Sequence, residues 1–554
     1  MTDKQNAPSL RSCFDFFDNN NQHLCTYLDS AASTQKLSAA LDYTDAFARH
    51  QYASVHRSAY TIASAATARY EEARKSLARF INANSDDIVF TSGATESINM
   101  IAKGLSQSML NGSTILIVQS EHHANILPWQ ALAEAFSLNI KVLPLAENGV
   151  FNEQTHAHWL NEINDDVAIL ACAHVSNVLG NIYPVASLCK KAQEHNAISV
   201  IDGTQAVAHI KTDVAALHCD FYVFSGHKMY GPTGIGVCWG RAVMLEKLRP
   251  SKLGGEMVQA VSFEAYTAVA PPLKFEAGTP NIMGALGLAQ ACDFLAQHLH
   301  DIERQEAALY RHLCHKMQAI HEITMLGNES ASIGIVSFYA PNADNHSLAL
   351  KLYQKGIALR FGQHCAMPLL SSMGISACLR VSLGCYNNRE DVDTFVSALK
   401  EALADSAEDS IEDKQYIDAR SDLKTVHADS VATAIKSASG WPQKHRQLLL
   451  ISQQLPLLSE PQRNENNEVH GCEARVWIAK DQQTNAVLAY GDSKVVRGLL
   501  TLMLHKYASD KQQGRASKAS DYLKFLDDIG LSDYFSSGRK DGMTRVAERL
   551  GQLT

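Results

Sequence analysis

The stretch Phe221-Tyr-Val-Phe-Ser-Gly-His-Lys228 decides the fold of this chain. Its apolar and aromatic residues predict a buried strand, after which the chain turns through Ser, Gly and His to a lysine. Open α/β sheets place their ligands at the carboxyl ends of such strands. Lysine is usually solvated, so a surface loop lysine is the simple alternative for this position. The neighbouring segments indicate whether Lys228 belongs to a ligand site or to a surface loop.

A second apolar strand, Ile198 to Asp202, precedes this one and ends in an acid. Pyridoxal phosphate chemistry requires an amine and a carboxylate, because the amine binds the aldehyde and the carboxylate keeps the ring nitrogen protonated. Taken alone, Asp202 fits a helix cap or a turn equally well. Together with Lys228 it indicates pyridoxal 5'-phosphate as the cofactor.

Two further segments fit the same cofactor. Thr91-Ser-Gly-Ala-Thr95 follows a short strand and precedes a helical run, so its amides and the Thr95 hydroxyl could hold a phosphate, although such a turn alone is weak support. Glu121-His122-His123 follows another strand, and a flat imidazole there could lie on a pyridine ring. A histidine pair also suggests a metal, but no acidic or cysteine partner lies nearby at ligand spacing, and we expect no metal.

Length and composition describe a multidomain globular protein. The chain has 554 residues, of which 46% are hydrophobic and 19% charged, and this excludes disorder across the whole chain. The formal charge of -9 provides no basic excess for nucleic acid. A signal-peptide core and an apolar run of about 18 residues are both absent from the sequence, and the twelve cysteines lack close pairing. We therefore expect a cytoplasmic protein that binds neither nucleic acid nor membrane.

The pattern of strands and helices predicts two separate domains. Residues 25–280 alternate between the two, which indicates a large α/β domain whose mostly parallel sheet is covered on both faces. Residues 281–400, together with the N-terminal segment, predict a small α+β subdomain. Residues 401–436 carry an acidic excess with few large apolar side chains, so we expect a solvated linker. Residues 437–554 predict an independent α+β domain.

Several segments in the first 400 residues carry a resemblance to a known family. They are Tyr27-Leu-Asp-Ser-Ala-Ala, Glu121-His-His-Ala-Asn-Ile-Leu-Pro-Trp-Gln, His174-Val-Ser-Asn-Val-Leu-Gly, Ser225-Gly-His-Lys-Met-Tyr-Gly-Pro-Thr-Gly-Ile-Gly and Phe275-Glu-Ala-Gly-Thr-Pro-Asn. In this order they resemble the cysteine desulfurases of the group that includes SufS and CsdA. That family is similar to class V aminotransferases and has the fold type I of pyridoxal phosphate enzymes. Gln363 before His364 favours the CsdA-like branch.

The resemblance implies a role for each matching residue. Lys228 would bind the cofactor and shuttle the Cα proton, Asp202 would pair with the ring nitrogen, and His123 would stack on the ring as a catalytic group. The other cofactor contacts would be Thr95, Asn177, Gln205, Ser225, His227 and Thr279. Thr279 would reach the phosphate of the neighbouring subunit, which implies a homodimer.

The nucleophile is expected on the loop Arg360-Phe-Gly-Gln-His364-Cys365-Ala-Met-Pro. A cysteine beside His364 and Arg360 has an electropositive setting that favours the thiolate, although any one of twelve cysteines could simply be buried. The family pattern implies that Cys365 takes sulfur from L-cysteine as a persulfide and that alanine is released. Arg380 would bind the substrate carboxylate, a task that suits a guanidinium, with Arg360 and Asn177 beside the substrate.

The C-terminal domain carries a second resemblance. Val469-His-Gly-Cys472-Glu-Ala-Arg-Val-Trp477 and Gly491-Asp-Ser-Lys-Val-Val-Arg-Gly-Leu-Leu500 are similar to the SufE and CsdE sulfur-acceptor proteins. Alone, Cys472 could be an incidental thiol; the resemblance implies that it accepts sulfur from Cys365. The sulfur would then pass to proteins that assemble iron–sulfur clusters or another thio-cofactor.

Two alternatives remain for the whole chain. A selenocysteine lyase or another aminotransferase-like enzyme would keep Lys228 and Asp202 without needing Cys365 or Cys472. A sulfur-carrier scaffold with an inactive desulfurase half is the alternative that is not an enzyme.

Overall fold

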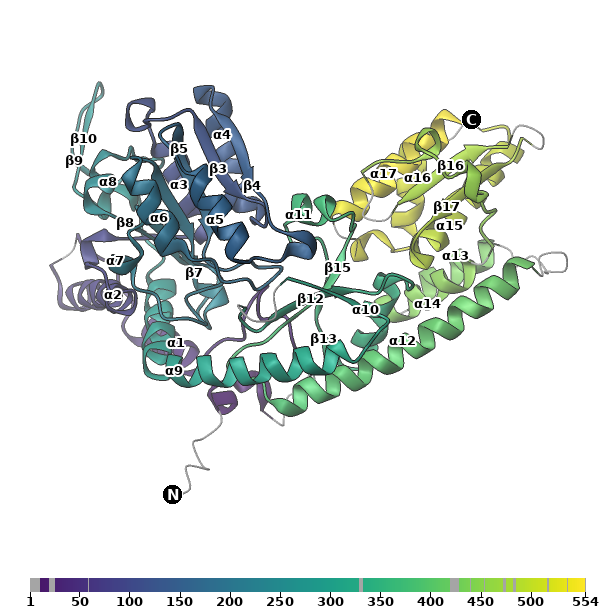
Figure 1. Ribbon diagram of the computed structural model, residues 1–554, viewed down its shortest axis with the longest axis horizontal. Helices are drawn as coiled ribbons and strands as arrows, with labels where there is room; N and C mark the ends of the chain where they lie inside the picture. Colours follow the sequence, from purple (N-terminus) through teal and green to yellow (C-terminus); the bar gives the residue numbers. More distant parts are fainter. Residues whose placement is uncertain are drawn as a thin grey trace, which may run out of the picture. The chain divides into compact units, whose positions relative to one another are not determined.

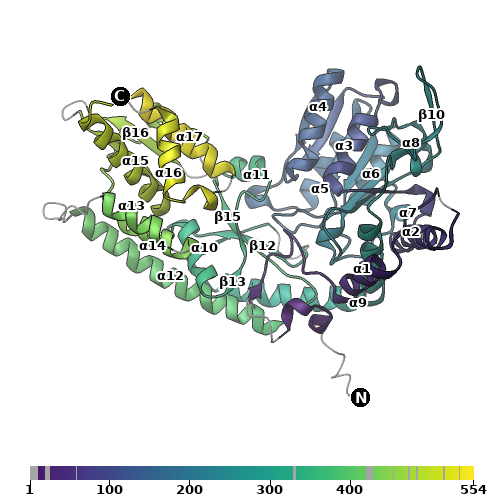
Figure 2. The ribbon, with the colours of Figure 1, turned by 180° about the vertical axis from the view of Figure 1, so that it is seen from behind.

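The structure is a computed structural model of the chain, drawn in Figure 1 and from behind in Figure 2. It describes residues 10–18, 25–57, 59–327, 332–418, 428–438, 440–452, 454–471, 475–481, 485–515, 518–535 and 537–553. The chain forms two compact units, the first comprising Met1–Tyr339 and Tyr353–Ala398, and the second Ala340–Leu352 and Leu399–Thr554. Within the described ranges, no helix is long and apolar enough to cross a membrane.

A seven-stranded sheet forms the centre of the first unit (Figure 1). Its strands, in spatial order, are β2 (Ile88–Thr91), β8 (Gly236–Gly240), β7 (Phe221–Ser225), β6 (Ile198–Asp202), β5 (Val167–Ala173), β3 (Thr114–Val118) and β4 (Asn139–Leu143). All neighbouring pairs are parallel except those of β8, which is antiparallel to both β2 and β7. The expected α/β fold with a mostly parallel sheet is confirmed.

Apart from the edge strand β4, the sheet is buried on both faces, because alternate residues of its strands enter different cores. Leu116 and Val118 of β3 belong to a core with Leu188 of α6, whereas Ile115 and Ile117 belong to a core with α3 and α4. This explains why the strands are continuously apolar rather than alternating. The helices of this part are α1 (Ser38–His50), α2 (Thr61–Phe80), α3 (Ala94–Gly104), α4 (Leu127–Phe136), α5 (Glu153–Glu162), α6 (Val185–Glu194), α7 (Val214–Leu217) and α8 (Ala242–Lys247).

A second, smaller sheet completes the first unit. Its four antiparallel strands, in spatial order, are β11 (Thr324–Leu326), β12 (Ile335–Tyr339), β15 (Cys378–Ser382) and β14 (Arg360–Gly362). The long helix α9 (Ile282–Gln318) precedes this sheet in the chain, and α11 (Met367–Ser372) lies between β14 and β15. The N-terminal segment contributes β1 (Thr26–Tyr27), which forms a separate parallel pair with β13 (Ile357–Ala358). A separate hairpin consists of β9 (Val258–Val261) and β10 (Tyr266–Ala268).

The second unit has its own core, made mainly by helices and one hairpin. Its helices and strands are α10 (Asn345–Gln354, in part), α12 (Arg389–Asp418, in part), α13 (Ala428–Ser437), α14 (Gly440–Ser452), β16 (Val476–Lys480), β17 (Val487–Gly491), α15 (Lys494–Gln512), α16 (Ala519–Asp528) and α17 (Ser537–Gln552). β16 and β17 are antiparallel, and Ile478 packs in one cluster with Leu448 and Leu499. The expected separate α+β body is therefore present.

The range 401–436, which the charge pattern predicts to be a solvated linker, is helical in its described part. Helix α12 (Arg389–Asp418) continues through its first half, and α13 occupies its end. Ile435 is fully buried in the core of the second unit, and Ala432 packs against that core. Net charge sums the residues on every face of a helix. The acidic excess therefore did not reveal that α13 has an apolar face, on which Ala432 and Ile435 lie three residues apart.

Candidate functional site

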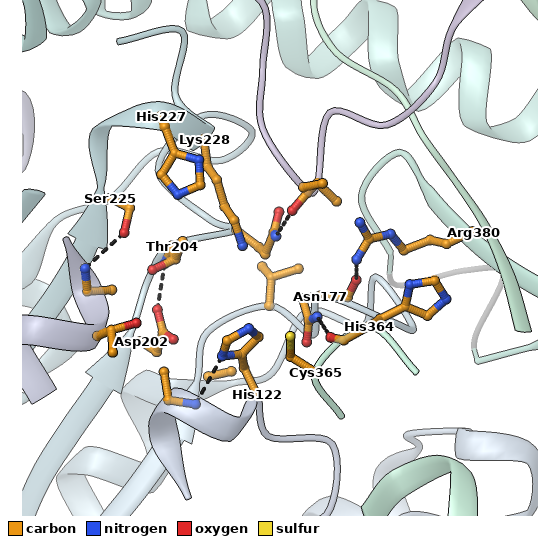
Figure 3. A pocket seen from close by; sticks show the side chains of 18 of the residues that line it. His122, Asn177, Asp202, Thr204, Ser225, His227, Lys228, His364, Cys365 and Arg380 are labelled. Carbon is orange, nitrogen blue, oxygen red and sulfur yellow. Dashed lines mark hydrogen bonds between the residues drawn. The ribbon is translucent and has the colours of Figure 1, made fainter. Parts of the chain in front are cut away.

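Two neighbouring strands deliver the polar side chains that the sequence singled out. β6 ends in Asp202, β7 ends in Ser225, and the single turn η7 (Gly226–Lys228) then brings Lys228 to the sheet edge. These residues line a cavity of about 250 Å³. Figure 3 shows the Lys228 side chain extending into this cavity, with Asp202 and Cys365 on its walls. The predicted amine and carboxylate therefore meet at the carboxyl edge of the sheet.

Burial shifts the protonation of both groups toward their neutral forms. Together with the Arg380 charge it lowers the pKa of Lys228 to about 8, while Asp202 opposes this shift. Burial also raises the pKa of Asp202, although the Thr204 N–H, 2.9 Å from Oδ1, favours its carboxylate. The Thr204 side chain, which also lines the cavity, favours the carboxylate as well. A carboxylate beside a partly neutral amine can receive a polar, cationic ring.

The N-terminus of α3 supplies hydrogen-bond donors to another part of the cavity wall. Ser225 Oγ accepts the Ala94 N–H at 2.8 Å, and Thr95 follows in the first turn. His227 lines the same cavity, and burial lowers its pKa to about 4, so its imidazole is neutral. A helix N-terminus together with hydroxyl and imidazole donors suits a phosphate group.

The histidine pair is divided between two tasks, and the expected role of His123 needs correction. His122 lines the cavity (Figure 3), whereas His123 does not belong to its lining. Burial and the Lys228 charge lower the pKa of His122 to about 4. Its Nδ1 accepts the Ala124 N–H at 3.0 Å, so the neutral ring carries its hydrogen on Nε2. His122 is thus the imidazole that can lie on a ring held by Lys228.

His123 instead contacts the loop that carries Cys365. Its backbone N–H donates to the Cys365 carbonyl at 2.8 Å, and its Nε2 accepts the Met367 N–H at 3.2 Å. Sequence spacing could not separate the two histidines, because adjacent residues in a tight turn point in different directions. Their positions in the three-dimensional turn decide which one faces the cavity.

Arg360 and Arg380 stand directly opposite each other on the paired strands β14 and β15. Like charges in this position repel. Asp29 offsets the repulsion, since its carboxylate accepts Arg360 Nη2 at 3.0 Å and Arg380 Nη2 at 3.3 Å. Arg380 Nη1 also donates to the Asn177 carbonyl at 2.9 Å. Two guanidinium groups and one carboxylate leave one surplus positive charge, which suits a ligand with a single carboxylate.

Cys365 is exposed, and its sulfur faces the cavity from the loop between β14 and α11 (Figure 3). The φ angles of His364 and Cys365 are 52° and 55°, a left-handed conformation that costs on the order of 1–3 kcal/mol for each residue with a Cβ. The Asn177 side-chain amide donates to the His364 carbonyl at 2.8 Å. Burial lowers the pKa of His364 well below its usual value. The predicted nucleophile thus lies beside a neutral imidazole on a strained loop.

Four further residues that the sequence predicts for the site differ in their position relative to the cavity. Gln205 lines the cavity and donates its amide to the Ala31 carbonyl at 2.8 Å. Asn177 also lines the cavity. Thr279 is exposed and lies away from the cavity of its own chain. Cys472 lies outside the described residues, directly after Gly471.

Three residues of the site had no role in the sequence analysis. His122 is named there only as the neighbour of His123, Asp29 only as one residue of a matching segment, and Thr204 not at all. Asp29 could have been found from its charge, because a lone acid in an apolar stretch needs a cationic partner once buried. The arginines that supply this partner lie more than 300 residues further along the chain.

The fold and site together define a class of enzymes. A seven-stranded mixed sheet with a lysine and an acid at its carboxyl edge, followed by a smaller antiparallel sheet, is the architecture of class V aminotransferases. The sequence model of that family, aminotransferase class-V, matches residues 26–395. A second family model, SufE, described as an Fe-S metabolism associated domain, matches residues 429–554.

Individual relatives of the chain are named cysteine desulfurases, which is a narrower group than class V aminotransferases. A probable cysteine desulfurase of Pseudomonas putida is 42% identical over 380 residues, covering 68% of this chain and 94% of the relative. A cysteine desulfurase of Salmonella agona is 42% identical over 377 residues, covering 67% and 92%. Among solved structures, the cysteine desulfurase CsdA from Escherichia coli is similar with a TM-score of 0.64 and 36% identity, covering 71% of this chain and 98% of the other. The apo cysteine desulfurase from Thermococcus onnurineus NA1 gives 0.68 and 34%, covering 72% and 99%. The chain belongs to the cysteine desulfurases of the class V aminotransferase family and carries a C-terminal SufE domain.

Proposed function

We propose that this chain converts L-cysteine to L-alanine and carries the released sulfur first on Cys365 and then on Cys472. The observation that carries the proposal is that the Cys365 sulfur and the Lys228 amine face one cavity, whose wall also contains Arg380. In a cysteine desulfurase, these are the groups needed to bind an amino acid and to remove its sulfur. The SufE domain supplies a reason for the second cysteine.

The residues of the cavity fit pyridoxal 5'-phosphate, on which the family depends. When bound, this cofactor supplies an aldehyde for an amine and an electron sink for the substrate. Asp202 would hold the ring nitrogen, His122 would lie on the ring, and Lys228 would hold the aldehyde carbon. The set of groups supports this assignment, because a buried carboxylate, a partly neutral amine, and hydroxyl and imidazole groups at a helix N-terminus match the ring nitrogen, the aldehyde and the phosphate. The phosphate would be held by Thr95, Ser225 and His227.

Substrate orientation would come from the arginine pair. Arg380 is held by Asp29 and the Asn177 carbonyl, so its guanidinium is pre-oriented before a carboxylate arrives. The side chain of Arg380 is only 2% exposed, which strengthens its interaction with a charged ligand because little water competes. Arg360 is half exposed and shares the same aspartate. This arrangement would fix the α-carboxylate of L-cysteine and leave its thiol free to turn toward Cys365.

Lys228 and Cys365 would carry the chemical steps. The Lys228 amine is partly neutral near neutral pH, so it can take the proton from the substrate Cα and later return one. The Cys365 thiolate attacks the substrate sulfur, and an S–S bond forms as the C–S bond breaks. The electron pair of the broken bond stays with the carbon, and protonation at Cβ gives the methyl group of alanine. Cys365 is left as a persulfide.

The SufE domain would then receive the sulfur. The Cys472 thiolate attacks the terminal sulfur of the Cys365 persulfide, which restores the Cys365 thiolate and leaves the persulfide on Cys472. An acceptor on the same chain raises the local concentration of the second thiol. The description of the SufE family supports iron–sulfur cluster assembly as the destination. We propose in addition that the enzyme works in the cytoplasm as a homodimer, with Thr279 completing the partner's phosphate site.

The proposal is tested by product analysis after a Cys365→Ser substitution. L-Cysteine is added to the purified holoenzyme, and alanine is measured together with sulfur released by a thiol reductant. We expect the unsubstituted protein to produce both in equal amounts and the variant to lose nearly all activity. Alanine formation at an unchanged rate in the variant would reject the persulfide route and favour a lyase or an aminotransferase-like reaction.

A further inference from the structure

The backbone around Cys365 depends on bonds from outside its loop. His364 and Cys365 both have positive φ values, which residues with a Cβ adopt only when the surroundings hold them there. Three bonds from other elements reach the backbone of this stretch, and in addition the His364 ring donates its Nε2–H to the Cys378 carbonyl of β15 at 3.1 Å. The Asn177 amide donates to the His364 carbonyl, the His123 N–H donates to the Cys365 carbonyl, and His123 Nε2 accepts the Met367 N–H. Two of the three therefore come from one residue.

The imidazole of His123 is suited to accept a hydrogen bond. Nε2 can accept the Met367 N–H only while it carries no hydrogen, so the ring must be the neutral tautomer with its hydrogen on Nδ1. Burial lowers the pKa of His123, which favours this neutral form at neutral pH. The charged form would present an N–H to the Met367 N–H and break the bond.

The turn that carries His123 is itself firmly attached to the main sheet. Trp129 Nε1 donates to Asn125 Oδ1 at 2.8 Å, and a tryptophan can only donate, so the Asn125 amide nitrogen must point the other way. That nitrogen donates to Glu121 at 2.7 Å, and the same carboxyl group accepts the Ala173 N–H at 2.7 Å. Glu121 and Asn125 are fully buried. His123 therefore connects the loop that carries Cys365 to a turn that is bonded to β5 of the main sheet.

We propose that His123 is a positioning residue that holds the Cys365 loop in its reactive conformation through its bond to the Met367 N–H. It acts through Cys365 and does not touch the cofactor or the substrate. The inference deepens the proposed function, since it concerns how Cys365 is presented to the substrate sulfur. Its loss should lower the rate at which the persulfide forms and should leave the binding of L-cysteine nearly unchanged, because Arg380 and Lys228 keep their own contacts.

A matched pair of variants separates the effect of losing the hydrogen bond from the effect of replacing the imidazole ring. In His123→Gln, the side-chain oxygen is as many bonds from the Cα as the histidine Nε2, so it can still accept the Met367 N–H. In His123→Asn, the side-chain oxygen is only as far from the Cα as the histidine Nδ1, so it cannot reach Met367. Hydrogen exchange of peptides that contain Met367 is followed in the holoenzyme by mass spectrometry, without substrate. We expect His123→Asn to speed exchange at this amide by about two- to tenfold, the range for one hydrogen bond, and His123→Gln to restore protection.

Kinetics give a second and independent measurement. We expect His123→Asn to lower kcat by a similar two- to tenfold factor with an unchanged KM for L-cysteine, and His123→Gln to restore kcat. Cofactor absorbance and thermal unfolding confirm that each variant is folded and loaded. Unchanged exchange in His123→Asn, or equal behaviour of the two variants in both assays, would overturn the proposal. Because the exchange assay needs no turnover, failure of the unsubstituted protein to act on L-cysteine would reject the proposed function without deciding this inference.

Discussion

The ionisation of Lys228 offers a quantitative test of the site. Burial and the Arg380 charge lower the pKa of this amine to about 8, whereas a solvated lysine has a pKa of about 10.4. At pH 7 the neutral fraction is therefore about one tenth, against about one in 2,500 for a solvated lysine. Because only the neutral amine attacks an aldehyde, covalent capture of pyridoxal phosphate by the apoprotein should rise through pH 8 and reach a plateau above about pH 9.

Two substitutions should move this midpoint in opposite directions. Arg380→Leu removes a positive charge that disfavours the protonated amine, so the pKa of Lys228 should rise and the midpoint should shift to higher pH. Asp202→Asn removes a negative charge that favours protonation, so the midpoint should fall. The assay is stopped-flow absorbance of the apoprotein after addition of the cofactor, from pH 6.5 to 10. A midpoint above pH 10 in the unsubstituted protein, or the same midpoint in all three proteins, would refute the reasoning.

Three further changes test separate parts of the structure. Arg380→Lys keeps the charge but loses the two-pronged guanidinium, so KM for L-cysteine should rise about ten- to hundredfold in steady-state kinetics; an unchanged KM would show that Arg380 does not bind the carboxylate. Ser225→Ala removes the acceptor of the Ala94 N–H, and cofactor affinity measured by fluorescence titration should fall about fivefold, whereas equal affinity would argue against a phosphate at this helix. Glu276→Gln breaks the buried pair with Arg74, whose Nη1 and Nη2 lie 2.6 and 2.9 Å from the carboxylate. It should lower the free energy of unfolding by about 3–5 kcal/mol in denaturant titrations, and a stability within about 1 kcal/mol of the unsubstituted protein would contradict this account.

The strands of the main sheet could be predicted because burial on both faces leaves an unbroken apolar run. Ile198–Asp202 agrees with the prediction at both ends, and the strand at Phe221 is one residue longer than predicted. The edge strand β4 was missed, since four of its five residues are exposed and its sequence has no such run. The antiparallel direction of β8 could not be read either, because the composition of a strand does not record its direction.

The site shows where sequence reasoning reached its limit. Lys228, Asp202 and Cys365 could be named because each stands at the end of an element or in a distinctive motif. The contacts of Asp29 with Arg360 and Arg380 depend on residues more than 300 positions away, which only the folded chain brings together. The separate orientations of His122 and His123 follow from one tight turn, and a motif match cannot distinguish neighbours within it.

The central claim, that sulfur moves from Cys365 to Cys472, is tested most directly by mass spectrometry of both thiols. The holoenzyme receives one equivalent of sulfur-labelled L-cysteine and is quenched at increasing times with an alkylating reagent. In the unsubstituted protein we expect the label on Cys365 first and on Cys472 later, and in Cys472→Ser we expect it to stay on Cys365. Label that reaches Cys472 in a Cys365→Ser protein, or that never reaches Cys472 in the unsubstituted protein, would contradict the relay.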